Sequence, residues 1–105
     1  MNITITNPTG TYDVQAIYDK TSRDISLYTM DGEDFVTATV MPPREMILRD
    51  NEVCINDYSP ENAGAFQALL DKNAIEFLYE FPFIRTPDGR LNEVKVCRVN
   101  EKMFT

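Results

Sequence analysis

Apolar and polar residues alternate along much of the chain, and a period of two is typical of strands that bury one face. In the first part of the chain, the alternation predicts strands over residues 2–6, 12–18, 25–29 and 35–41. Further on it predicts strands over residues 52–56, 74–84 and 91–99. Seven strands without long linkers between them indicate one sheet-rich domain over residues 1–105.

Proline and glycine mark the turns between these strands. Asn7-Pro8-Thr9-Gly10 predicts a turn, because proline presets the backbone and glycine closes it. Asp31-Gly32 predicts a hairpin, with a type I′ turn that needs positive φ at both residues. Pro42-Pro43 should end the fourth strand, because proline has no N–H to donate to a ladder.

One short helix is predicted, over about residues 60–72. Ser59 would be its N-cap, Pro60 suits the first helical position, and Asn73 is a plausible left-handed stop. Gly64 either weakens this helix or lets a strand approach it closely. The elements together predict an α+β fold: an antiparallel, strongly bent sheet of about six or seven strands with the helix on one face.

An aromatic run is the sharpest feature of the second half. The alternation places four rings on one face of the predicted strand: Phe77, Tyr79, Phe81 and Phe83. Pro82 should confine this strand to a sheet edge or a bulge. Most of these rings suit a core, but one short helix cannot easily cover them all. We therefore expect at least one of the last three to be exposed, or covered only by another chain, with Glu76 and Glu80 assisting encounter with a partner.

The chain is acidic, with 17 acidic and 10 basic side chains, a net charge of −7 and no histidine. The missing histidine excludes Ser-His and Cys-His catalysis and histidine-ligated metals. The acidity argues against direct binding of nucleic acid, although mimicry of nucleic acid stays open. Three acids cluster at the predicted hairpin, Asp31, Glu33 and Asp34, where they form a solvated turn or an acidic patch for a basic protein.

The two cysteines, Cys54 and Cys97, stand in apolar strand-like runs. Without an export signal, we expect them to be reduced and buried rather than bridged. No motif calls for a cofactor or a metal. No apolar stretch is long enough to cross a membrane and no leader is recognisable, so we expect a cytoplasmic protein without membrane contact.

Residues 25–40 contain a strand, an Asp-Gly-Glu hairpin and a Thr-Val strand before a proline-containing loop. This stretch resembles small uncharacterised proteins of phages, conjugative elements and gut bacteria. The resemblance continues through Asn56-Asp57-Tyr58-Ser59-Pro60-Glu61-Asn62 into a short helix, and it ends in the apolar strand of residues 94–99. It covers about residues 12–99 and departs over residues 76–90. It implies a phage or mobile-element gene in a bacterial cytoplasm, and no reaction.

Three functions follow as hypotheses. The first is a non-enzymatic interaction protein that binds a bacterial host protein, such as a defence or regulatory factor, through an acidic and aromatic surface. The alternative is a homo-oligomer that binds a small molecule in a pocket between subunits. The second alternative is a minor hydrolase that uses paired carboxylates, which would need such a pair with raised pKa in a cleft.

Overall fold

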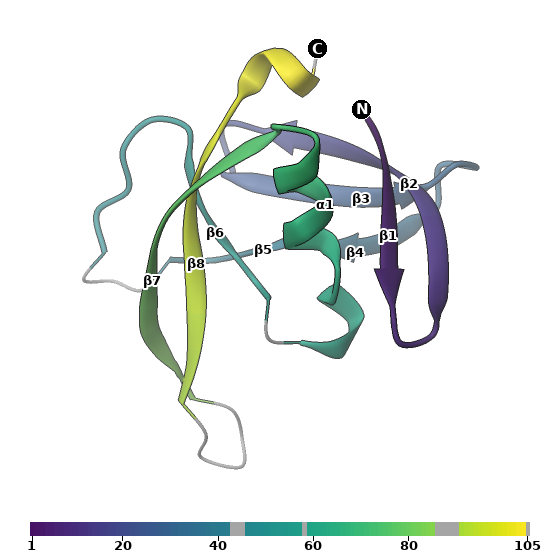
Figure 1. Cartoon of the computed structure of the whole chain (residues 1–105). Coiled ribbons are helices and arrows are strands. Elements are labelled where there is room, and N and C mark those ends of the chain that lie inside the picture. Colours follow the sequence, from purple (N-terminus) through teal and green to yellow (C-terminus); the bar gives the residue numbers. More distant parts are fainter. Residues whose placement is uncertain (43–45, 58, 86–90, 105) are drawn as a thin grey trace.

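The computed structural model describes residues 1–42, 46–57, 59–85 and 91–104. Two antiparallel sheets of four strands and one α-helix make up the fold (Figure 1). The first sheet has the order β1-β2-β3-β4, from strands Asn2–Asn7, Gly10–Asp19, Asp24–Thr29 and Asp34–Thr37. The second has the order β5-β6-β8-β7, from strands Thr39–Val40, Glu52–Ile55, Leu91–Val99 and Ile75–Arg85. The predicted α+β class, with antiparallel pairing and a single short helix, is confirmed.

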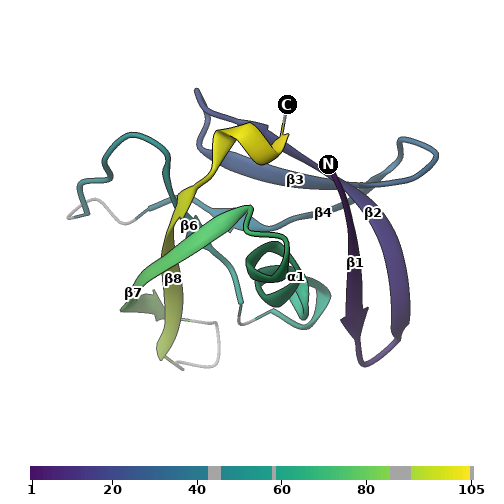
Figure 2. The same ribbon diagram turned by 45° about the horizontal axis from the view of Figure 1, so that its top comes forward.

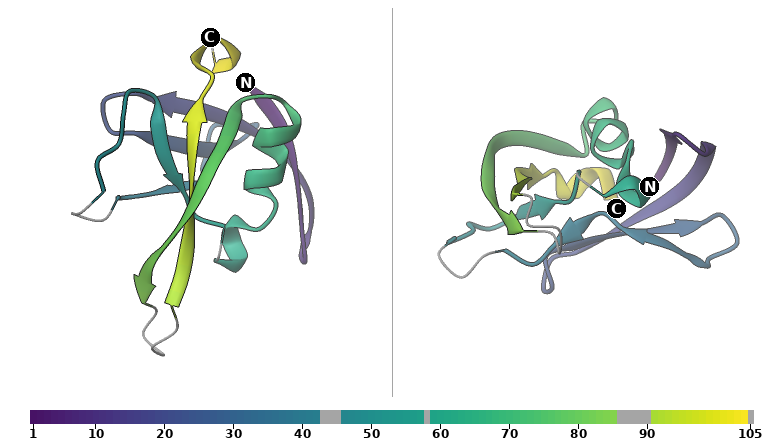
Figure 3. Two further views of the ribbon diagram at one scale, coloured as in Figure 1. Left: turned by 60° about the vertical axis from the view of Figure 1, so that its left-hand side comes forward. Right: turned by 90° about the horizontal axis from the view of Figure 1, so that it is seen from below.

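The predicted strand of residues 35–41 is shared between the two sheets. It runs as β4 in the first sheet, passes through the fully buried Ala38, and continues as β5 in the second. The Ala38 N–H donates to the carbonyl of Ile25 in the first sheet at 2.9 Å, and the Ala38 carbonyl accepts from the N–H of Asn56 at 2.8 Å. One residue therefore connects both halves of the fold, which the views of Figure 2 and Figure 3 show at an angle to each other.

The hairpin at Asp31-Gly32 is present, between β3 and β4. Its turn differs from the predicted type I′, because φ is positive at Gly32, at 89°, and not at Asp31. The N–H of Gly32 and the carbonyl of Glu33 instead bond to the backbone of Thr29, at 2.9 and 2.8 Å. A longer loop thus closes this hairpin with one left-handed glycine. The Asn7–Gly10 turn lies between β1 and β2 as predicted.

The helix begins later than the predicted residue 60. A 3-10 turn covers Pro60–Asn62, and α1 covers Ala65–Asp71. Gly64 interrupts the two with φ of 89°, and a Cβ at this position would overlap the carbonyl oxygen of Thr6 in β1. Ser59 stands at the N-cap of the 3-10 turn rather than of α1, and its side chain makes no capping bond; its hydroxyl oxygen instead accepts from the Asn56 amide at 3.1 Å. Asn73 does adopt the left-handed stop, with φ of 57°.

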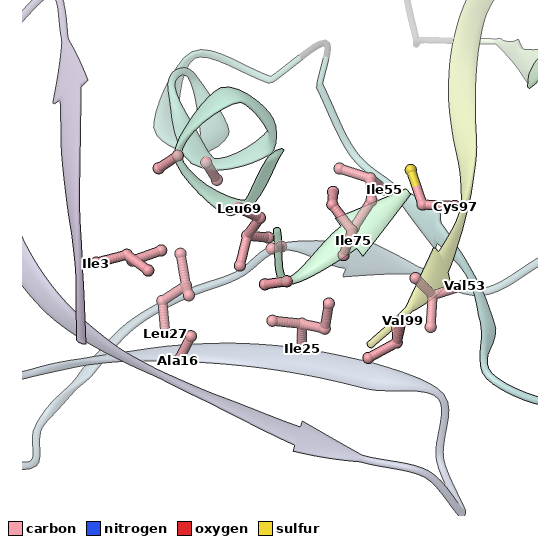
Figure 4. Packing of buried hydrophobic residues seen from close by; sticks show 14 of the residues in the cluster. Ile3, Ala16, Ile25, Leu27, Val53, Ile55, Leu69, Ile75, Cys97 and Val99 are labelled. Atoms are coloured by element: carbon pink, nitrogen blue, oxygen red, sulfur yellow. The ribbon is translucent and has the colours of Figure 1, made fainter. Parts of the chain in front are cut away.

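The main hydrophobic core lies between the two sheets and α1. Leu69 of the helix packs there among residues of both sheets (Figure 4). A smaller cluster covers the other face of the second sheet, where Cys54, Val94 and Val96 pack against half-buried side chains such as Leu78 and Phe81. Strand β6 is consequently buried on both faces, which explains the apolar run Val53-Cys54-Ile55. Glu52, which is also buried, accepts a hydrogen bond from the N–H of Arg49 at 2.9 Å.

Both cysteines are free and buried, as predicted. None of the helices in the described ranges has the length and apolar character needed to pass through a bilayer.

Candidate interaction surfaces

Among the strands of the described ranges, β7 is an edge strand that pairs with β8. The register shifts between Phe77 and Tyr79, so that Phe77 lies opposite Cys97 while Tyr79 lies opposite Val96. Neighbouring residues of β8 point to opposite faces of the sheet. The bulge therefore separates the rings, and the prediction that four aromatic residues share one face is wrong. A period-two pattern cannot reveal an inserted residue.

Phe77 lies on the helix side of the sheet and is 43% exposed. Its ring meets Phe66 of α1 edge-on, with 5.9 Å between centroids. The ammonium of Lys95 lies 5.1 Å from the Phe66 centroid and 5.7 Å from the Phe77 centroid. The same ammonium donates to Glu80 at 2.6 Å and lies 3.7 Å from Asp57. The Phe77 ring is therefore held on one side by Phe66 and by the Lys95 ammonium, which the two carboxylates keep in place.

Tyr79 is 44% exposed, so the prediction that at least one of the named rings is open to solvent is confirmed. Phe81 is half-buried against the smaller core cluster. The side chain of Phe83 lies outside the described part of the structure. Glu76 is exposed beside Arg98 at 3.4 Å, and an ion pair this open to water contributes little stability. Tyr79 and Phe77 are therefore the exposed anchors of β7.

A pair of carboxyl groups, Glu80 and Glu93, faces Lys95 across β7 and β8. The hydrogen bond with Glu93, followed by the bond and charge of Lys95, lowers the pKa of Glu80. The bond and charge of Glu80 raise the pKa of Glu93, and the bond to Glu80 raises that of Lys95. The two carboxyl groups interact with each other, so the one that ionises first makes ionisation of the other harder, and their pKa values move apart. Both groups are exposed on a strand face, whereas a hydrolase needs its pair to flank a substrate cleft.

The acidic cluster of Asp31, Glu33 and Asp34 is exposed on the β3–β4 hairpin, as its sequence suggested. This hairpin lies at the opposite end of the molecule from β7 in each view (Figures 1 and 2). The structure therefore does not bring the predicted acidic and aromatic residues into one surface. Within the described ranges, no three acidic or thiol side chains are placed to hold a metal ion.

A second aromatic surface, missed in the sequence, lies near the acidic hairpin. It is a groove of about 470 Å³, and its walls come from the β1–β2 turn, β4 and the 3-10 turn: Asn7, Pro8, Thr9, Tyr12, Phe35 and Pro60. The Tyr12 and Phe35 rings meet at 48°, with 5.5 Å between centroids. These residues come from three separate segments of the chain, so no local sequence motif predicts the groove. We call this surface the Tyr12–Phe35 groove.

Neither a protein family model, nor a curated protein, nor a solved structure matches this chain.

Proposed function

We propose that this chain is a non-enzymatic protein of a phage or mobile element that binds a bacterial host protein in the cytoplasm through strand β7. The observation that carries the proposal is the exposure of two aromatic rings on one edge strand, Phe77 at 43% and Tyr79 at 44%. Large aromatic side chains dominate the energetics of protein interfaces, because each one buries a large area when it docks.

The edge position supports side-chain docking rather than indiscriminate strand pairing. An edge strand exposes unpaired backbone groups, and natural proteins protect such edges with prolines and bulges. Strand β7 carries Pro82 and register shifts at residues 77–79 and 82–84. A partner that grips this edge would contact Tyr79 and Glu76 on one face of the strand and Phe77 and Glu80 on the other, without adding a continuous new strand. The mechanism of action would then be steric occlusion of the partner.

The other two hypotheses receive less support. The Glu80–Glu93 pair is exposed on the strands, whereas a hydrolase holds its two carboxylates beside a bound substrate in a cleft. A homo-oligomer remains the specific competitor, because two copies of β7 could cover each other's rings. The experiment below separates these outcomes.

Replacing Tyr79 with alanine is expected to weaken capture of the host partner by at least about tenfold, because an interface aromatic contributes about 2 kcal/mol or more. The free energy of unfolding should change by less than about 1 kcal/mol, since the ring is largely exposed. Capture from bacterial lysate, followed by titration of the captured protein, measures the first quantity, and urea unfolding measures the second.

Ile17→Ala is the matched control, because Ile17 is 52% exposed on β2 of the other sheet. It should leave capture unchanged. Equal capture by the Tyr79 and Ile17 variants would refute the role of β7. A wild-type dimer in sedimentation that dissociates on Tyr79→Ala would favour the homo-oligomer instead.

A further inference from the structure

We infer that the Tyr12–Phe35 groove binds an extended, proline-containing peptide segment that carries a basic residue. The groove and β7 are separate surfaces, so this inference does not rest on the proposed function. Its evidence is the chemistry of the groove walls, the fixed position of the Tyr12 ring and the charge of the neighbouring hairpin.

The walls of the groove suit a polyproline II segment. Two aromatic rings set at 48° form an angled apolar surface, with Pro8 and Pro60 beside them. Small-molecule sites usually enclose most of their ligand, whereas this groove is a surface feature formed by two turns and a strand. Grooves lined by aromatic rings recognise proline-rich segments, because polyproline II is already ordered before binding and loses little entropy.

Hydrogen bonds hold the groove in place before a ligand arrives. The side-chain oxygen of Asn7 accepts from the N–H of Thr9 at 2.9 Å and from its hydroxyl at 2.6 Å. The Thr9 hydroxyl oxygen also lies 2.8 Å from the Tyr12 hydroxyl. This chain of bonds fixes the Tyr12 ring, and a site that is already ordered binds at a smaller entropic cost.

The same bonds leave one donor for a ligand. A backbone N–H can only donate, so the Thr9 N–H identifies which end of the Asn7 amide is the oxygen. The amide nitrogen is then the other end, and it bonds to no group of the described ranges. Proline segments have carbonyl oxygens without competing N–H groups, and these oxygens need donors of this kind.

The acidic hairpin that leads into Phe35 favours a basic residue in the ligand. Asp34 directly precedes Phe35 but pairs with Tyr28, so its carboxylate lies on the other face of the strand from the groove, and Asp31 and Glu33 lie in the same exposed hairpin. The ion pairs formed between described residues include none of these three carboxylates. Uncompensated charge at a binding surface speeds the encounter with an oppositely charged partner and fixes its orientation. An arginine or lysine next to the prolines would meet this charge.

The test uses the full chain and labelled synthetic peptides of about ten residues, a length that spans the surface in polyproline II form. One peptide has prolines flanked by arginines, a second replaces the prolines with glycines, and a third replaces the arginines with glutamines. Fluorescence anisotropy should show binding of the first peptide, with at least about tenfold weaker binding of the second. The third should bind more weakly than the first and with less dependence on salt.

Phe35→Ala should weaken binding of the first peptide by at least about tenfold, and Asp34→Asn should reduce the salt dependence. Because Phe35 also packs on the core, the binding site is mapped independently on the wild-type protein by amide chemical shifts, which should change around Asn7, Tyr12 and Phe35. Tyr79→Ala should bind the peptide like wild type, so failure here and failure of the β7 proposal are distinguishable.

Several outcomes would overturn the inference. Equal binding of the proline and glycine peptides would show recognition of charge alone. Shifts centred on β7, or no binding of the first peptide up to about 1 mM, would exclude the groove as its site. Self-association that Phe35→Ala abolishes would identify a second copy as the occupant, since the chain itself contains prolines next to an arginine in Pro42-Pro43-Arg44.

Discussion

Gly64→Ala is expected to lower the free energy of unfolding by about 3 kcal/mol, through two separate effects. The backbone at this position has φ of 89°, and a side chain in this region costs about 1–2 kcal/mol. The new methyl group would also overlap the Thr6 carbonyl oxygen and lie 3.0 Å from the Ile5 side chain. Strand β1 would have to move away from the helix, and repacking a dense core costs about 1–3 kcal/mol.

Gly32→Ala provides the control, because the two glycines have the same φ and differ in their surroundings. Gly32 also has φ of 89°, but a Cβ there would meet no atom within 4 Å. Its substitution should therefore show only the backbone effect of about 1–2 kcal/mol. Urea unfolding of both variants gives the difference. If both variants lose the same free energy of unfolding, β1 can move away from Gly64 at no cost, which would contradict the tight packing of β1 against this glycine.

Native Cys54 and Cys97 are expected to react with a thiol reagent at least about 100-fold more slowly than the same residues in urea at pH 8. Burial raises the pKa of Cys54 to about 11 and that of Cys97 to about 12. The thiolate is the reactive form, and an unfolded thiol has a pKa of about 8.5. The two side chains also cannot bridge, because Cys54 lies opposite Val96, whose neighbour Cys97 faces the other side of the sheet.

The same shifts predict how stability depends on pH. A thiol whose pKa is higher in the folded state stabilises the fold fully below about pH 8.5. This stabilisation is lost as the pH rises toward 11, with a slope of up to about 1.4 kcal/mol per pH unit for each thiol. The variant Cys54→Ala should show a shallower slope than wild type. Rapid labelling of both native thiols at pH 8 would contradict the burial on which these expectations depend.

Local patterns predicted the strands and most of the turns, because alternation, proline and glycine act within a few residues. They could not predict that the strand through Ala38 divides between two sheets, since both halves have the same period. The predicted start of the helix was wrong for a related reason. The close approach of β1 to Gly64 requires a glycine there, and β1 is distant in the sequence. The pattern treated Gly64 as a weak helical residue.

The candidate surfaces show the same limit. The exposure of Tyr79 followed from a simple count of aromatic rings against one short helix. The opposite placement of Phe77 depended on a bulge that the sequence does not mark. The residues of the Tyr12–Phe35 groove come together only through the pairing of β1 with β2 and the position of the 3-10 turn, and neither could be predicted from the sequence of one segment. Surfaces built by tertiary contacts cannot be read from spacing alone.

The bonds around Ala38 have a consequence for how this molecule comes apart. Its N–H bonds to Ile25 of β3 and its carbonyl to Asn56, the residue directly after β6. The Thr39 hydroxyl donates to Asp24 while accepting from the Ile25 N–H. Neither sheet can fray at this crossing without removing partners from the other. Partial unfolding that releases one sheet is therefore penalised in both. We expect one cooperative transition, with amide protons of β3 and β6 exchanging only when the whole domain opens.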